Sequence, residues 1–97
     1  MYAVIFRAEV NELDTSYTEM AARMRELAKS EYGCKEFISV IEDTFEIAVS
    51  YWDTEEQIQQ WKNDPEHLVA QEIGKSKWYK SYQVQIVNIA REYCSNT

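Results

Sequence analysis

The strand pattern of this chain constrains its fold more than any other feature. In the first predicted strand, alternation places Val4 and Phe6 on one face and Ala3 and Ile5 on the other, so both faces are apolar. A strand of this kind is expected to be covered on both sides. Similar runs of β-branched and aromatic residues recur along the chain between polar turns. The strands predicted from these runs are segments 2–9, 35–42, 45–52 and 82–90.

Helical spacing predicts the element that follows the first strand. Apolar residues recur on one stripe over segment 15–29, and Asp14 is placed to cap the N-terminus of this helix. The second and third strands are separated only by the polar pair Asp43–Thr44, which predicts a hairpin.

Two further helix starts follow the hairpin. Asp53, with Glu56 three residues later, resembles a capping box that begins a helix ending near Trp61. Next, residues 64–65 read Asp-Pro, which is an N-cap with proline at the first helical position. This second helix is expected to run to about Tyr79.

The predicted order is therefore β-α-β-β-α-α-β. This is the split β-α-β, or ferredoxin-like, pattern of the α+β class with a broken second helix, in a single domain over residues 1–97. Helices in such a fold cover one face of the sheet, whereas the strands here are apolar on both. The free face is expected to meet the same face of a second copy, so the sequence predicts a homodimer.

The charge of the chain argues against one class of partner. Seventeen acidic residues against ten basic ones give a net charge of -7, which repels phosphate backbones, so no nucleic acid is expected. No membrane partner is expected either, because no apolar run approaches the roughly 20 residues that span a bilayer. The N-terminus lacks the pattern of a signal peptide, so we expect a cytoplasmic protein with reduced thiols. Cys34, Cys94 and one histidine indicate neither a disulfide scaffold nor a zinc site.

Chemically capable residues cluster in the second half of the chain. Helical spacing places His67, Gln71, Gly74 and Trp78 on one face. A neutral His67 could act as a general base, since the start of a helix disfavours the imidazolium. Gly74 within a helix costs about 1 kcal/mol relative to alanine, which the close approach of a ligand would explain. A structural interpretation stays open: a surface histidine, Trp61 and Trp78 packed in the core, and a glycine that relieves crowding against the sheet.

Arg7 is the second candidate for chemistry. It shares a strand face with Ala3 and Ile5, and a buried cation must be paired or must bind an anion. Its partner could be Glu36 or Glu46 on a neighbouring strand, or the anion of a substrate.

Two motifs give the chain a family resemblance. The first begins at Ser50 and reads SYW–x5–I–x2–W; the second begins at Pro65 and reads PEH–x3–Q–x2–G–x3–WY–x2–Y. Together with VIFR in the first strand, they make the chain resemble the antibiotic biosynthesis monooxygenase (ABM) family, and more narrowly its small stand-alone bacterial members. The resemblance implies a dimeric α+β barrel with a pocket between sheet and helices in each subunit.

Members of this family have two kinds of activity. Some oxygenate polycyclic phenols or quinols with O2 and without metal or flavin, which requires an aromatic pocket and a base. Others bind and degrade haem through an Asn on the first strand, a Trp at the end of the second helix and a His about ten residues later. In this chain Trp61 matches the Trp, but Arg7 and Gln71 occupy the other two positions, and His67 lies one turn early.

The resemblance implies an oxidoreductase that oxygenates a small aromatic or quinol-like compound with no cofactor and no metal. In this interpretation Arg7 holds the substrate anion and His67 removes its proton. Two alternatives stay open, namely a non-catalytic small-ligand binding module on the same fold and a haem-binding protein. The residues expected to bind the substrate are Trp61, Asn63, Gln71, Gly74, Trp78 and Tyr82.

Overall fold

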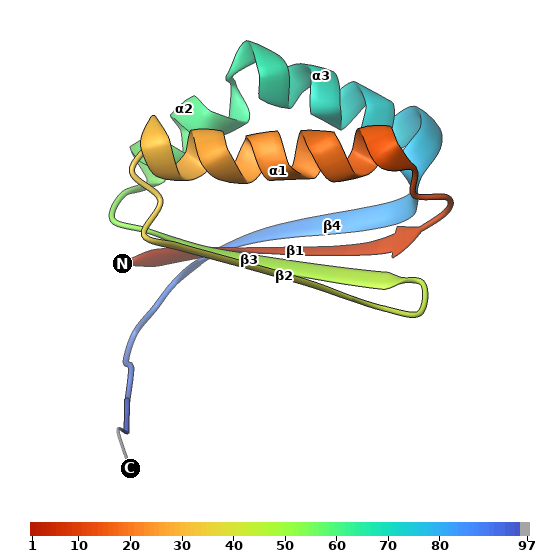
Figure 1. Ribbon diagram of the computed structural model, residues 1–97. Helices are drawn as coiled ribbons and strands as arrows, with labels where there is room; N and C mark the ends of the chain where they lie inside the picture. The colour runs from red at the N-terminus through yellow and green to blue at the C-terminus, as the bar shows by residue number, and fades with distance from the viewer. Residues whose placement is uncertain (96–97) are drawn as a thin grey trace.

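The computed structural model describes residues 1–95 and shows a layer of helices over one face of a four-stranded sheet (Figure 1). The prediction of one domain over residues 1–97 extends two residues beyond the described part. The elements, in chain order, are β1 (Tyr2–Val10), α1 (Thr15–Ser30), β2 (Glu36–Glu42), β3 (Phe45–Trp52), α2 (Glu55–Lys62), α3 (Pro65–Ile73), the π-helical turn η1 (Gly74–Trp78) and β4 (Tyr79–Asn88).

The sheet has the strand order β2-β3-β1-β4, and every neighbouring pair is antiparallel. In its centre Phe6 of β1 lies opposite Ala48 of β3 and Val84 of β4. Because side chains alternate along a strand, this register places these residues on the same face, toward the helices. The α+β, ferredoxin-like fold predicted from the sequence is confirmed.

Local capping explains where α1 and α3 begin. The Asp14 side chain accepts from the backbone N–H of Tyr17 at 3.0 Å, as an N-cap residue does. The Asp64 side chain accepts from the backbone N–H of Glu66 at 2.8 Å, and Pro65 occupies the first turn, where no N–H is needed. Both starts agree with the sequence-based prediction.

The start of α2 corrects the prediction by one residue. The capping box is formed by Thr54 and Gln57, not by Asp53 and Glu56. Thr54 Oγ1 accepts from the N–H of Gln57, and Gln57 Oε1 accepts from the N–H of Thr54, both at 3.2 Å. The predicted spacing was right, but a Thr/Gln pair satisfies these two donors one position later.

The helix after Pro65 ends earlier than predicted. In the π-helical turn that follows α3, the N–H of Tyr79 donates to the carbonyl of Gly74. The carbonyl of Trp78 accepts from the N–H of Asn11 at 2.7 Å, and Tyr79 pairs with Val10. These bonds pair the chain with the end of β1 from Tyr79 onward. β4 therefore begins at Tyr79, three residues before the predicted strand.

The core packs at the end of β3, where the Trp52 side chain is fully buried between sheet and helices. Its Nε1 donates to Ser50 Oγ at 2.8 Å, and the Trp61 ring lies 5.2 Å from it, centroid to centroid. Trp52 pairs with Tyr2 at the start of β1, so this cluster fills only one end of the space under the helices. Its other buried members are Val4, Met24, Leu27, Ala28, Cys34 and Ile58.

Within residues 1–95, no helix covers the opposite face of the sheet (Figure 1), and several large apolar side chains on it are exposed. On this face Val40, Phe45 and Ile47 keep 58%, 60% and 44% of their surface exposed. Strands with two apolar faces, as the sequence predicted, are therefore confirmed. Within residues 1–95, no helix has both the length and the apolar character needed to cross a bilayer.

Candidate functional site

A cavity of about 410 Å³ lies between the sheet and the helices, beside the core cluster. This volume is within the range of small-molecule sites. On β4 the side chains of Tyr82, Val84 and Ile86 line the cavity and stay about two-fifths exposed, so the cavity opens along this edge strand. Its walls are largely aromatic. The aromatic side chains that form them are Phe6, Tyr17, Phe37, Trp61, Trp78, Tyr79 and Tyr82.

One end of the cavity carries a polar pair formed by His67 and Gln71. Gln71 Nε2 donates to the carbonyl of Lys62 at 3.0 Å and lies 2.9 Å from His67 Nδ1. Because a carbonyl can only accept, this Gln71 atom is the amide nitrogen, and its second hydrogen points to Nδ1. His67 Nδ1 is then an acceptor and the proton of the neutral ring is on Nε2. Burial lowers the pKa of His67, which favours this neutral form.

This geometry changes the chemistry expected of His67. The nitrogen that could take a proton already accepts from Gln71, and the other nitrogen carries one. In the conformation described, His67 can donate a hydrogen bond through Nε2 rather than act as a base.

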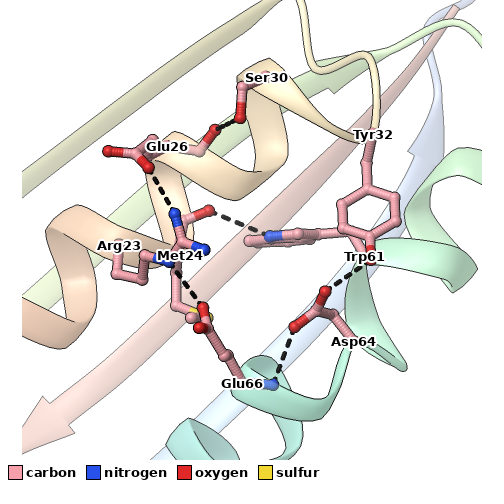
Figure 2. A network of polar contacts seen from close by, with 8 residues as sticks. All are labelled: Arg23, Met24, Glu26, Ser30, Tyr32, Trp61, Asp64 and Glu66. Carbon is pink, nitrogen blue, oxygen red and sulfur yellow. Dashed lines mark hydrogen bonds and ion pairs between the residues drawn. The ribbon is translucent and has the colours of Figure 1, made fainter.

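A network between α1 and the α2–α3 connection holds this end in place (Figure 2). The indole Nε1 of Trp61 donates to the carbonyl of Met24 in α1 at 3.1 Å. The His67 ring stands edge-on to Trp61, with centroids 4.3 Å apart. The orientation of His67 thus depends on how Trp61 is anchored. The side-chain links that complete the network are Arg23–Glu66 at 2.7 Å and Tyr32–Asp64 at 2.6 Å.

The other end of the cavity carries a buried carboxyl group, Glu46. Glu46 is 5% exposed, and its Oε1 accepts from the hydroxyls of Tyr17 and Tyr79, the latter at 3.5 Å. Burial raises the pKa of Glu46, which the two hydroxyl donors only partly offset. Burial also raises the pKa of both tyrosines, so they remain neutral donors.

Gly74 and Trp78 of η1 complete this end. Trp78 is buried and stands edge-on to Tyr17, with ring centroids 5.3 Å apart. A Cβ at Gly74 would lie 3.0 Å from Cδ2 and Cε2 of Tyr79, so the glycine allows that ring to approach the helix closely. Of the two explanations that the sequence left open for Gly74, relief of crowding against the sheet therefore applies, since the crowding group is the Tyr79 ring of β4.

The structure brings most of the predicted site residues together. Asn63 is an exception: it is the exposed C-cap residue of α2, outside the cavity wall. Six others line the cavity as expected, namely Trp61, His67, Gln71, Gly74, Trp78 and Tyr82.

Arg7 corrects the prediction. It lies opposite Ile47 and Gln83 on the exposed face of the sheet, because it is one residue out of register with the cavity-lining Phe6. It therefore does not reach an anion in this cavity. It does not pair with Glu46 either, since Glu46 points to the other face.

Sequence reasoning missed Glu46, Tyr17 and Tyr79 as site residues. A signal for Glu46 was present in the sequence. The other residues on its face of the strand are Ala48, Ser50 and Trp52, so Glu46 is the one charged residue on an otherwise uncharged face.

The described residues offer few ligands for a metal ion or for haem iron. Within the described residues, no group of three His, Cys, Asp or Glu side chains is placed to hold a metal ion. The two cysteines are free, with Cys34 buried and Cys94 exposed. Haem iron needs an unprotonated imidazole nitrogen, and Nδ1 of His67 is engaged by Gln71.

Sequence comparison finds a relative that is similar over nearly the whole chain. The chain is 44% identical over 92 residues to the uncharacterised protein YqjZ of Bacillus subtilis, covering 94% of this chain and 81% of YqjZ. A scan against protein-family models gives no match.

Several solved structures are similar in fold. Rv0793 of Mycobacterium tuberculosis superposes with a TM-score of 0.80 at 12% identity, over 96% of this chain and 98% of that one. SnoaB, a cofactor-independent oxygenase from Streptomyces nogalater, gives 0.78 at 11% identity over 94% of each chain. A provisionally named antibiotic biosynthesis monooxygenase from Nitrosomonas europaea gives 0.76 at 16% identity, over 92% of this chain and 89% of that one. At such identities the likeness concerns the fold, and it confirms the α+β, ferredoxin-like fold predicted for the chain.

Proposed function

The chain belongs to the family of Bacillus subtilis YqjZ and has the fold of the antibiotic biosynthesis monooxygenases, and on this premise we propose that it oxygenates a small aromatic or quinol-like compound with O2. One observation carries the proposal: an aromatic-walled cavity of about 410 Å³ with a polar group at each end. Aromatic walls suit a flat ring, and a few placed polar groups fix its orientation. SnoaB, which has the same fold, is a cofactor-independent oxygenase.

The reaction needs no electrons from outside the substrate. For a phenol, one ring C–H and the hydroxyl group both become C=O. One oxygen atom of O2 enters the ring, and the other leaves as water with the ring hydrogen and the hydroxyl hydrogen. The protein has to hold the ring, accept the hydroxyl proton and stabilise the negative charge that develops on oxygen.

Two residues at the His67 end would stabilise charge and position the ring. Nε2 of His67 carries a proton that can be donated to an anionic oxygen. Trp61, anchored by its bond to Met24, forms the adjacent wall. Removal of one such donor typically lowers turnover by about 10²–10³-fold, which is the loss expected for His67→Ala.

Oxygen uptake and isotope labelling test the activity. The protein is incubated with a panel of phenols, naphthols and quinols under ¹⁸O2, and oxygen consumption and product mass are measured. We expect one ¹⁸O atom in the product and no hydrogen peroxide. Formation of peroxide with an unlabelled quinone would indicate simple oxidation. Binding without oxygen consumption would leave a non-catalytic binding module.

We also propose that a second copy of the chain covers the exposed face of the sheet. The apolar side chains there, including Val40, Phe45 and Ile47, remain about half exposed in the single chain. Burial of such a surface against its own equivalent is the common basis of symmetric dimers. Sedimentation at micromolar concentration should give about twice the chain mass of 11.5 kDa, and a stable monomer would contradict the proposal.

A further inference from the structure

Glu46 is unusual among the charged groups of the cavity. Of the described residues that line it, Glu46 is the only acidic one, and it is 5% exposed. The basic residues of the wall, Arg25, Lys62 and Lys75, are all exposed, so water screens their charge. The buried end of the cavity therefore carries a carboxyl group without a cation, which is unfavourable for an anionic ligand.

The two oxygens of Glu46 have different environments. Both recorded hydrogen bonds, from Tyr17 and Tyr79, go to Oε1. In the described part of the chain Oε2 has no such partner. Since Glu46 lines the cavity, Oε2 is the carboxyl oxygen left for a ligand there.

Trp78 supplies a second unused group at the same end. Its Nε1 is a buried donor without a hydrogen-bond partner among residues 1–95. Buried donors are rarely left unpaired, because an unmade bond is costly. Trp78 lines the cavity and packs against Tyr17, whose hydroxyl holds Glu46. Trp78 and Glu46, which each have one polar atom without a partner, are thus both in contact with Tyr17.

We propose that this end of the cavity binds a neutral aromatic hydroxyl group, with Trp78 Nε1 donating to its oxygen and Glu46 Oε2 accepting its proton. The inference rests on the proposed function and names the substrate as a hydroxyarene bound in its uncharged form. In the transfer, the ligand O–H bond breaks, an Oε2–H bond forms, and the electron pair stays on the ligand oxygen as a phenolate. Glu46 is then the catalytic base that His67 was predicted to be.

Burial supports this assignment. It raises the pKa of Glu46 and so brings its proton affinity closer to that of a phenol. Tyr17 and Tyr79 hold Oε1 in place, which fixes the direction of Oε2.

Three ligands that share the naphthalene ring system separate the two contacts. 2-Naphthol can donate and accept, 2-methoxynaphthalene can only accept, and naphthalene can do neither. Their dissociation constants are measured by equilibrium dialysis for the wild type, Glu46→Gln and Trp78→Phe. Glu72→Gln, an exposed carboxylate on α3 outside the cavity wall, is the matched control.

The wild type should bind 2-naphthol about tenfold more tightly than its methyl ether, the usual effect of one hydrogen bond. Glu46→Gln should abolish this preference, because the amide nitrogen that replaces Oε2 is a donor and cannot accept the hydrogen bond of the naphthol hydroxyl. Trp78→Phe should weaken the binding of 2-naphthol and of the ether but not that of naphthalene. Glu72→Gln should resemble the wild type.

Turnover provides an independent readout. With a phenol that the wild type consumes, Glu46→Gln should lower kcat by roughly 10²–10⁴-fold, as loss of a positioned base does. A purely structural Tyr–Glu contact would leave the ligand preference and kcat intact. If Glu46→Gln does not fold, the Trp78→Phe comparison still decides the donor contact.

The outcomes for the proposed function and for this inference differ. A preference for the hydroxyl that depends on Glu46, without oxygen uptake, supports the inference and contradicts oxygenation. Oxygen uptake with no such preference, and with unchanged kcat in Glu46→Gln, contradicts the inference alone. Failure of the wild type to bind any of the three ligands overturns the hydroxyarene site.

Discussion

Replacing Glu46 by Gln is expected to stabilise the protein while lowering its activity. The carboxyl group is 5% exposed, and the burial that raises its pKa also destabilises its charged form. Gln has a similar shape, and its amide oxygen still accepts from Tyr17 and Tyr79, so the variant keeps both hydrogen bonds and loses the charge and the acceptor Oε2. Replacing buried ion pairs by uncharged residues of similar volume is often neutral or stabilising by about 1–4 kcal/mol, because the charges no longer have to be removed from water. Because two donors already stabilise the charge here, we expect a gain of about 1 kcal/mol at pH 7.

The pH dependence of this gain has a defined sign. The pKa of Glu46 is higher in the folded protein than in the unfolded chain, so between the two values the folded state binds more protons. The free energy of unfolding of the wild type therefore falls as the pH rises through this interval and is constant above it. Below the unfolded value, about 4.3, the carboxyl is neutral in both states and the penalty is absent. The facing groups, Tyr17 and Tyr79, do not titrate in this range, since burial raises the pKa of both.

Urea unfolding between pH 3 and pH 8 checks both statements. Wild type, Glu46→Gln and the control Glu72→Gln are compared at one fixed protein concentration, because dimerisation would couple stability to concentration. Glu46→Gln should match the wild type near pH 3 and exceed it at neutral pH, and Glu72→Gln should show no such divergence. A Glu46→Gln protein that is less stable than the wild type at pH 7 would refute the reasoning, because it would show that hydrogen bonds specific to the carboxylate outweigh the effect of its burial.

Three further predictions concern other parts of the molecule. Gly74→Ala gains about 1 kcal/mol of helix propensity but brings a Cβ to 3.0 Å from the Tyr79 ring. Because these effects oppose each other, we expect little change in stability to urea but weaker binding of 2-naphthol. Unaltered binding would contradict a role of Gly74 in positioning the Tyr79 ring. The double change Val40→Lys and Ile47→Lys should give a monomer in sedimentation, because these residues are cross-strand partners on the exposed face, whereas Leu68→Lys on α3 should not. Hemin titration should give no Soret band typical of histidine ligation, because His67 Nδ1 accepts from Gln71; a stoichiometric band that His67→Ala removes would show that the imidazole is free to bind iron.

The sequence determined the architecture because its signals are local. The caps at Asp14 and Asp64 act on backbone groups two or three residues away, so the starts of α1 and α3 could be read directly. Strand alternation likewise assigned each β1 residue to a face. The end of α3 was not predicted, since the π-helical turn depends on pairing with Val10 at the end of β1 and on a bond from Asn11 just beyond it, both far away in the sequence.

The site was only half determined by the sequence. Helical spacing places residues 67, 71, 74 and 78 on one face, and all of them line the cavity. Alternation also showed that Arg7 and Phe6 face opposite sides, but not which side the helices would cover. The tertiary structure decided this, and with it the loss of Arg7 from the site and the entry of Glu46. The partners of Glu46 come from α1 and β4, at positions 17 and 79, so only packing could show that this carboxyl group is buried and held by two hydroxyls through one of its oxygens.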